Sequence, residues 1–339
     1  MTLPIQKLPI LVIHLILQTM GFQDMFLLTR ISTKMKRIVQ RMGRIPKHCL
    51  YVTIGRTIMI QIQTMTYDRY PDLMNVVARK NDPPGWFSPF NMKIGSVACL
   101  PSAFCKYSDG QNVVETCWND IKVGCDELCN EIIELFNTPV RSVTLKLYRR
   151  TNYQNEINWT NSTFPNLVIF ELIGHCNFQD YMWMIKNAKA TEELHFGMEP
   201  SGYPVNKNSL VVIPLELKHI EIEHGKWVSL RQLEAIKSNY IMVKEADLTD
   251  SEINEFLMNL KNSKEKPKFK ELYILFDRQS DTTVVFEGLQ DEDVLEPNIG
   301  LQELVFKTGN GQKCAVTYNL FEFERPAIDL LGYEVLIED

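Results

Sequence analysis

A short apolar pattern recurs through the second half of the chain at intervals of 23–32 residues. The copies follow the form apolar-x-x-apolar-x-apolar, with centres at Val143, Phe170, Leu194, Ile220, Val243, Leu272 and Leu304, although the copy at Leu194 is weaker and the copy at Val243 is degenerate. Candidate helices lie between copies, over residues 180–188, 230–238 and 251–259. A strand followed by a helix at this period predicts an irregular, leucine-rich-repeat-like α/β solenoid with a parallel sheet. The alternative is a set of ordinary α/β segments at uneven spacing.

The pattern changes after the last copy. Residues 304–307 and 314–318 flank Thr308-Gly309-Asn310-Gly311, and this arrangement predicts a C-terminal β-hairpin. An antiparallel hairpin would cover the open edge that a solenoid otherwise exposes.

The chain before the repeat has three kinds of segment. Apolar residues alternate over 50–54 and 58–62 around Gly55-Arg56-Thr57, which predicts a β-hairpin. Residues 66–115 contain several Pro and Gly turn signals, so irregular structure is expected there, with short strands near 92–97. Residues 120–136 have the apolar spacing of a helix.

The first 46 residues contain two short apolar runs, 8–17 and 25–32, followed by a basic segment at 34–39. This pattern predicts three short helices that are apolar on more than one face. So few residues cannot bury that surface among themselves, because domains below roughly 40 residues rarely stand alone. The segment must therefore dock on another surface.

This N-terminal segment resembles an F-box, the module that binds the Skp-type adaptor of cullin-based ubiquitin ligases. The matching positions are Leu8-Pro9, Ile16-Leu17, Asp24, Leu27, Leu28, Ile31 and Ser32. Leu11 replaces the usual Glu, and Met35 replaces the usual Trp. The resemblance implies that the adaptor contact and the core beneath it consist of Leu8, Pro9, Val12, Ile16, Leu17, Leu27, Leu28 and Ile31.

Charge is distributed unevenly along the chain. The net charge is −6, yet residues 1–108 carry +10 and the remainder −16. Complementary potentials speed association, so Lys34, Lys36 and Arg37 are expected to steer the third helix toward an acidic adaptor. The overall negative charge argues against nonspecific nucleic-acid binding.

A second resemblance lies within the repeat region. Trp227-Val228-Ser229-Leu230-Arg231-Gln232-Leu233 and the later run from Leu248 to Leu257 resemble the nematode type-2 F-box-associated domain. Leu260 stands near the place where that family usually has a second Trp. Thr249 is a candidate N-cap with Glu252 at the capping-box position. We expect structural roles for these residues, with Trp227 anchoring the preceding loop.

The sequence offers no sign of catalysis. Phosphate-binding glycine loops, nucleophile elbows and zinc-protease motifs do not occur in it. The eight cysteines form no Cys-x-x-Cys pair, so we expect reduced thiols packed in the core of a cytoplasmic or nuclear protein. The histidines adjoin the repeat strands, where structural roles are more common than metal binding. We therefore predict a non-enzyme that has no cofactor and no metal.

A secreted protein is a competing interpretation. Lys7 precedes an apolar run that resembles a secretion signal, and residues 158–160 and 161–163 are glycosylation sequons. The run is too short for a membrane span, which needs roughly 20 apolar residues.

The resemblances together imply a substrate-recognition subunit of an SCF-type ubiquitin ligase, with an F-box over 1–46. A connecting region over 47–135 and a repeat-like α/β domain over 136–339 would follow, and the F-box-associated segment would span about 205–276. The F-box would bind the adaptor and, through it, a cullin. The alternative is a protein-binding module that acts outside a ligase. Outward-facing strand residues are the predicted target site: Ile169, Glu171, Glu193, His195, His219, Glu221 and Tyr273.

Overall fold

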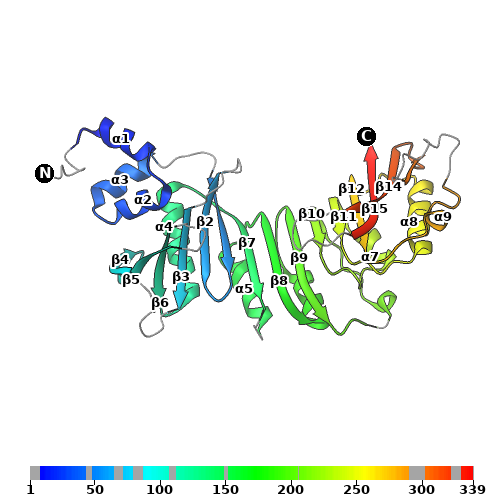
Figure 1. Cartoon of the computed structure of the whole chain (residues 1–339), viewed down its shortest axis with the longest axis horizontal. Helices are drawn as coiled ribbons and strands as arrows, with labels where there is room; N and C mark the ends of the chain where they lie inside the picture. The colour runs from blue at the N-terminus through cyan, green and yellow to red at the C-terminus, as the bar shows by residue number, and fades with distance from the viewer. Residues whose placement is uncertain are drawn as a thin grey trace. The chain divides into compact units, whose positions relative to one another are not determined.

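The computed structural model describes residues 8–42, 48–64, 72–78, 87–106, 112–148, 152–204, 206–289, 302–321 and 330–338. The chain forms two compact units, residues 1–146 and 147–339 (Figure 1). Each unit has its own buried apolar residues on one face of a β-sheet.

Unit 1 begins with the three predicted short helices. They are α1 (Ile10–Gln18), α2 (Phe22–Thr29) and α3 (Thr33–Met42). The Ser32 hydroxyl accepts a hydrogen bond from the backbone N–H of Met35, which caps the start of α3. The Met35 side chain, at the position where an F-box usually has Trp, is fully buried. None of the described helices combines the length and the apolar character that crossing a bilayer requires.

The sheet of unit 1 follows these helices. Its strands are β1 (His48–Ile54), β2 (Ile58–Thr64), β3 (Asp72–Ala78), β4 (Phe87–Ile94), β5 (Val97–Lys106), β6 (Asn112–Trp118) and β7 (Val140–Leu147). Their order is β7-β1-β2-β3-β6-β5-β4. The predicted hairpin is confirmed, because β1 and β2 pair antiparallel with Leu50 opposite Ile62 and Ile54 opposite Ile58.

The expectation of irregular structure over 66–115 was wrong where the structure describes the chain, since β3 to β6 lie there. Buried polar residues interrupt the apolar alternation of these strands, so the sequence pattern did not indicate them. The Thr116 hydroxyl donates to the backbone carbonyl of Asn75 at 3.0 Å and accepts from the Trp118 indole at 2.9 Å. Residues 65–71, 79–86 and 107–111 lie outside the described part of the chain.

Helix α4 (Ile121–Phe136) confirms the helix predicted at 120–136. Asp120 caps it by accepting from the backbone N–H of Lys122 at 2.8 Å, and Asn137 ends it in the left-handed conformation. Cys125 and Cys129 lie on its buried face, as expected of thiols in a core. All cysteines whose side chains the structure describes are free thiols.

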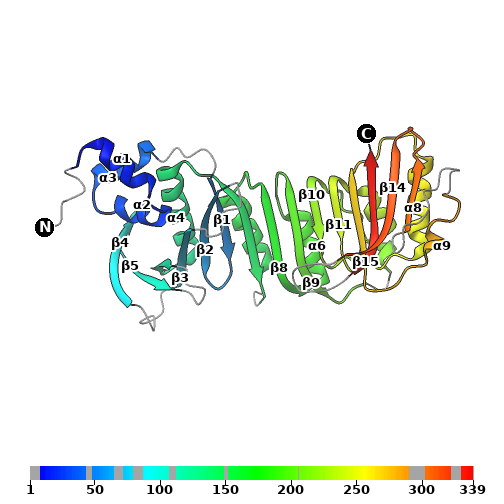
Figure 2. The same ribbon diagram turned by 45° about the horizontal axis from the view of Figure 1, so that its top comes forward.

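Unit 2 alternates helices and strands before it ends in antiparallel strands (Figure 2). Its helices are α5 (Tyr153–Thr163), α6 (Phe178–Asn187), the 3-10 turn η2 (Lys207–Ser209), α7 (Leu230–Ala235), α8 (Asp250–Asn262) and α9 (Thr282–Val285). Its strands are β8 (Ile169–Asn177), β9 (Glu193–Ser201), β10 (Glu216–Ile222), β11 (Lys237–Val243), β12 (Glu271–Phe276), β13 (Gln302–Lys307), β14 (Lys313–Phe321) and β15 (Leu330–Glu338).

The first five strands of unit 2 are parallel neighbours in chain order, β8-β9-β10-β11-β12. This confirms that the apolar pattern marks strands separated by helices. Four of the predicted central positions are buried and aligned across neighbouring strands: Phe170, Leu194, Ile220 and Leu272. In β11 the aligned residue is Ile241, whereas the sequence pattern predicted Val243, two residues later. The structure shows a mixed α/β fold with a large open sheet, whereas the leucine-rich-repeat solenoid stays a prediction.

The C-terminal hairpin is confirmed as β13 and β14, with Phe306 opposite Cys314. The hairpin does not pair directly with the parallel strand β12, as a cap on the parallel sheet would. Strand β15 lies between β12 and β14, antiparallel to both. The close pairing of β12 and β15 requires glycine at 332, because a Cβ there would collide with the backbone carbonyl of Ile274.

Candidate functional site

Helix α1 carries a group of exposed apolar side chains. Ile10, Leu11, Val12 and Leu15 are 54%, 68%, 38% and 57% exposed, and Ile31 after α2 is 65% exposed. Leu11 and Leu15 are four residues apart, so they share one face of the helix. Large exposed apolar side chains on successive turns of one helix are typical of protein contact surfaces.

The structure divides the predicted adaptor residues into three groups by burial. Leu17 and Leu28 are buried and belong to the core of the helical segment. Leu8, Ile16 and Leu27 are half-buried, whereas Pro9, Val12 and Ile31 are exposed. The exposed Ile10, Leu11 and Leu15 were missed, because α1 is apolar on nearly every side and periodicity could not indicate which face lies outward.

Helices α2 and α3 are fixed to α4 by a buried carboxylate. Glu131, only 7% exposed, lies with its Oε1 2.7 Å from Arg30 Nη2 and 2.9 Å from Lys36 Nζ. Burial raises the pKa of Glu131, but hydrogen bonds from Arg30 and Lys36 outweigh it, so this pKa lies below its usual value. Lys36, predicted to steer an adaptor, is therefore engaged within the chain, while Lys34 and Arg37 are exposed.

Further contacts join α2 and α3 to α4 and to strand β4. The Phe22 ring meets the Phe136 ring edge-on at 5.1 Å between centroids. Arg30 Nη1 donates to the backbone carbonyl of Lys93 at 3.0 Å, and Gln40 donates to Glu134 at 2.9 Å. The helical segment is thus packed into unit 1 rather than joined to it by the chain alone.

The predicted target residues of unit 2 lie together on one face of its sheet. The register places Glu171, His195 and Glu221 side by side, with Tyr273 further along the same row. Ile169, Glu193 and His219 form the neighbouring row. These side chains alternate with the buried core residues, so they face away from the core. The structure brings the predicted residues together, and their binding of a target stays a prediction.

Charged side chains on this open face form a connected cluster. His195 Nδ1 lies 3.1 Å from Glu221 Oε2, and His195 Nε2 lies 3.4 Å from Glu193 Oε2. Lys244 Nζ reaches the other oxygen of Glu221 at 2.8 Å and Glu223 at 2.7 Å. The hydrogen bond from His195, together with Lys244, lowers the pKa of Glu221 to about 2 despite burial. Burial lowers the pKa of His195. The hydrogen bond and negative charge of Glu221 have a larger, opposite effect, so the pKa of His195 lies above its usual value.

An aromatic ladder crosses the same face. His219 stacks on His195 with centroids 5.0 Å apart and on Tyr240 at 4.2 Å. Tyr240 in turn lies 5.3 Å from Tyr273, whose hydroxyl donates to Glu334 at 2.7 Å. The sequence did not predict Tyr240 as part of this face, because the pattern in β11 was read two residues out of register.

Trp227 is a buried anchor in unit 2, as predicted. It is 2% exposed, and its indole N–H donates to the Tyr181 hydroxyl at 2.9 Å. Nearby, Gln232 makes two hydrogen bonds with the backbone of Ile213, at 2.6 and 2.8 Å. These side chains tie the segment around α7 to its neighbours.

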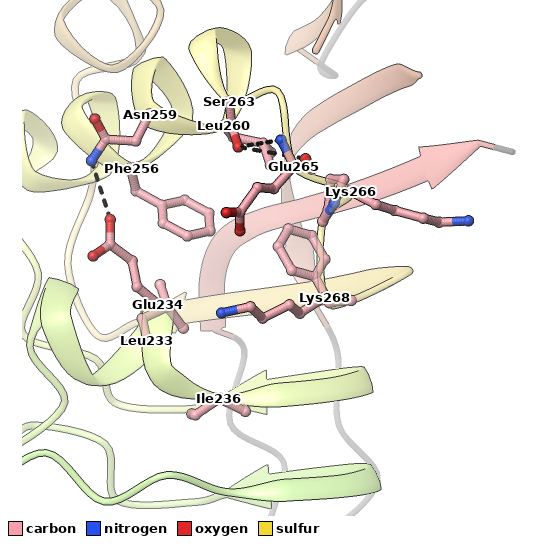
Figure 3. Close-up of a pocket in the computed structure, with 12 residues that line it drawn as sticks. Leu233, Glu234, Ile236, Phe256, Asn259, Leu260, Ser263, Glu265, Lys266 and Lys268 are labelled. Carbon is pink, nitrogen blue, oxygen red and sulfur yellow. Dashed lines mark hydrogen bonds between the residues drawn. The ribbon is translucent and has the colours of Figure 1, made fainter. Parts of the chain in front are cut away.

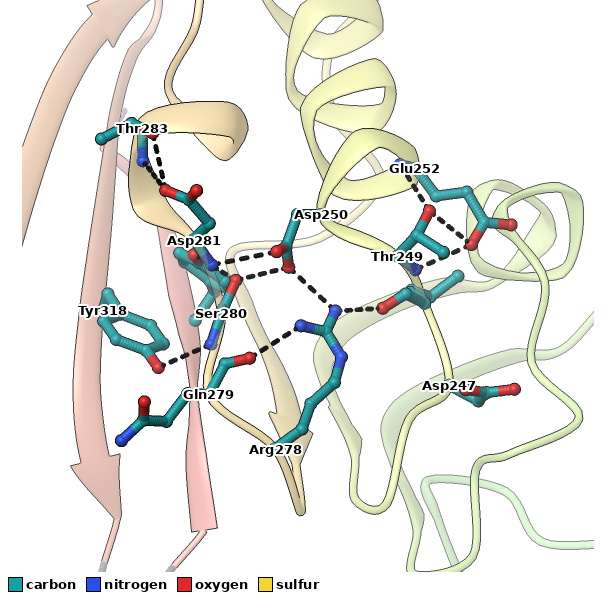
Figure 4. Close-up of polar contacts among 12 residues, drawn as sticks. Asp247, Thr249, Asp250, Glu252, Arg278, Gln279, Ser280, Asp281, Thr283 and Tyr318 are labelled. Carbon is teal, nitrogen blue, oxygen red and sulfur yellow. Dashed lines mark hydrogen bonds and ion pairs between the residues drawn. The ribbon is translucent and has the colours of Figure 1, made fainter.

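Helix α8 begins with the predicted capping box, since Thr249 and Glu252 exchange hydrogen bonds. Its next residue, Asp250, accepts from Ser280 Oγ at 2.6 Å, pairs with Arg278 at 2.8 Å and accepts from the backbone N–H of Asp281 at 2.9 Å (Figure 4). Burial raises the pKa of Asp250, but the Ser280 hydrogen bond and the other donors outweigh it and hold it below its usual range. The cluster joins α8 to the segment after β12.

A cavity of about 170 Å³ lies between α7, α8 and the segment leading into β12 (Figure 3). Phe256, Leu260 and Phe269 form its apolar part, and these side chains are at most 8% exposed. Glu234 accepts a hydrogen bond from Asn259 at its rim at 3.1 Å. Glu265 and Lys266, which are exposed, line its outer part.

Comparison with known families places two domains on the chain. Residues 5–47 match the F-box domain, and residues 212–274 match the domain described as F-box associated. Both agree with the segments inferred from the sequence. No curated protein and no solved structure matches the chain significantly. The chain therefore carries an F-box domain followed by an F-box-associated domain.

Proposed function

We propose that this protein is a substrate-recognition subunit of an SCF-type ubiquitin ligase. The exposed apolar surface of α1 and Ile31 carries the proposal, because it lies within the F-box match and has no cover in the described structure. A Skp-type adaptor would bury this surface and link the chain to a cullin. Unit 2 would hold the target, while the transfer chemistry belongs to other subunits. A cytoplasmic or nuclear location and a nematode origin are part of the same proposal.

Replacing Leu15 and Ile31 with Glu is expected to weaken adaptor binding at least roughly thirtyfold, since losing a central apolar anchor costs about 2 kcal/mol or more. Both side chains are more than half exposed, so the fold should survive the change. Isothermal titration with purified adaptor measures the effect. Val211→Glu is the matched control, because Val211 is 82% exposed and lies in unit 2. Equal adaptor affinity in the double variant and the wild type would refute the docking surface.

A reconstituted ubiquitylation reaction separates the proposal from a binding role outside a ligase. The complete chain, adaptor, cullin, RING subunit and ubiquitin-loaded enzyme are combined with a captured target. Ubiquitin transfer that requires the wild-type α1 surface supports the ligase role. Stable adaptor binding without any transfer would favour the alternative.

We further propose that the target binds the open face of β8 to β12. The row of Glu171, His195, Glu221 and Tyr273 supports this proposal, since acidic and aromatic groups together suit a basic or polar protein segment. Glu221 already contacts His195 and Lys244 within the chain, so it is a poor residue with which to test target binding alone.

Glu171→Ala combined with Tyr273→Ala is expected to reduce target recovery at least about tenfold and to leave adaptor binding unchanged. Affinity purification in the presence of adaptor, with quantitative mass spectrometry, measures the recovery. Lys186→Ala combined with Glu255→Ala is the control, because both residues are exposed on helices of the same unit. If the face variant and the control recover the same proteins, the target site lies elsewhere.

A further inference from the structure

Three side chains with metal-binding atoms meet on the open face of unit 2. His195 comes from β9, and His219 and Glu221 come from β10. One donor atom of each residue lies within 4.8 Å of the other two, and all three side chains are half-buried. The sheet register brings them together, because His195 is directly opposite Glu221 and diagonal to His219.

The distances are close to those of a tetrahedral metal site. Zinc–nitrogen and zinc–oxygen bonds of about 2.0 Å place neighbouring ligand atoms roughly 3.3 Å apart. His195 Nδ1 and Glu221 Oε2 are already 3.1 Å apart. The His219 ring stacks nearly parallel on the His195 ring, so its nitrogen reaches a shared metal only when the ring rotates out of this stack about its side-chain bonds.

His219 has a nitrogen with no role in the fold. Its Nε2 is buried and has no hydrogen-bond partner within the described part of the chain. A buried polar atom without a partner is unfavourable, so a ligand that occupies it is favoured. His175 and His224 differ, because each pairs with a carboxylate, Glu199 at 2.7 Å and Glu245 at 3.0 Å.

The position of Lys244 leaves one oxygen of Glu221 available to a metal ion. It contacts Oε1 of Glu221, while Oε2 of the same carboxylate faces His195. Glu223 lies 2.7 Å from Lys244 and balances its charge. Lys244 would then orient the carboxylate, as outer partners of metal ligands commonly do. Glu193, 3.4 Å from His195, adds negative charge beside the three ligands.

We propose that His195, His219 and Glu221 bind one divalent cation of the zinc class. Two imidazole nitrogens and one carboxylate oxygen suit Zn²⁺, whereas Mg²⁺ and Ca²⁺ prefer oxygen ligands alone. This site is independent of the F-box and goes beyond the proposed role in ubiquitin transfer.

Metal titration of the full chain tests the site. The protein is stripped with chelator, kept reduced and titrated with Co²⁺, whose visible absorption reports tetrahedral nitrogen and oxygen coordination. Zn²⁺ affinity follows from competition with a chromophoric chelator at fixed pH. We expect one equivalent to bind, without the sulfur-to-cobalt charge-transfer band that cysteine ligands would produce.

His219→Gln and His195→Gln are each expected to weaken binding at least about tenfold, since even outer partners of a metal contribute about 10- to 100-fold. His224→Gln is the matched control, because it removes a His–carboxylate pair in the same unit without touching the three ligands. Far-ultraviolet circular dichroism verifies that each variant is folded. Unchanged affinity in His219→Gln, an equal loss in His224→Gln, or a charge-transfer band in the wild type would each overturn the proposal.

Discussion

Trp227→Ala is expected to lower the free energy of unfolding of unit 2 by about 3–5 kcal/mol. The ring is 2% exposed, and it packs edge-on against Tyr181 at 5.9 Å between centroids. Truncation leaves a large void and removes the indole donor from the Tyr181 hydroxyl, which is itself buried. Urea unfolding of the full chain, followed by circular dichroism, measures the change.

The conservative variant Trp227→Phe separates volume from hydrogen bonding. It retains most of the aromatic bulk, so we expect a loss of about 1–2 kcal/mol, chiefly from the lost hydrogen bond to the Tyr181 hydroxyl, which still donates to the backbone carbonyl of His224. Adaptor binding should persist in both variants, because the F-box lies in unit 1. A loss below about 1 kcal/mol in Trp227→Ala would show that the ring does not anchor the fold.

Glu131→Gln is expected to destabilise unit 1 by about 2–3 kcal/mol. Removing one partner of a buried ion pair typically costs about 3–5 kcal/mol. We expect a smaller loss for Glu131→Gln, because Lys36 would still pair with the Glu134 carboxylate, 3.3 Å from its Nζ. Arg30 would be left only 14% exposed without its carboxylate. Thermal and urea unfolding at neutral pH measure the loss.

The effect of Glu131→Gln should depend on pH in a definite direction. Because the pKa of Glu131 is lowered in the fold, its stabilisation is complete above the unfolded pKa of about 4.3 and disappears as pH falls through the lower folded value. Wild type and variant should therefore converge in acid. Glu134→Gln is the control, since that carboxylate is 56% exposed and is expected to contribute less than about 1 kcal/mol. Equal losses in both variants would contradict the buried role of Glu131.

Local signals predicted much of the fold. The Thr249–Glu252 capping box and the buried face of α8 follow from spacing within one helix, so they can be recognised without tertiary information. The parallel strands were found because buried positions such as Phe170 and Ile220 are apolar in nearly every copy. The F-box was recognised from residue types at fixed spacing, which again depends only on nearby positions.

The failures share one physical cause, which is pairing between distant residues. Asn75 and Thr116 are buried because their strands meet, and neither would be placed in a core by its own polarity. The stacking of His219 on Tyr240 depends on the register of β10 and β11, and a two-residue error in β11 conceals it. Strand β15 was missed although its apolar residues alternate, because nothing nearby indicates that it pairs with β12.

The position of β15 has a consequence for how the chain is made. Strand β12 leaves the ribosome more than fifty residues before β15, its antiparallel partner in the sheet. At roughly 5–20 residues per second, the nascent chain exposes the backbone of β12 for several seconds. An unpaired parallel edge attracts other strands, so this interval is when the protein is most prone to aggregate. Pairing of this edge of β12 therefore waits for the synthesis of β15.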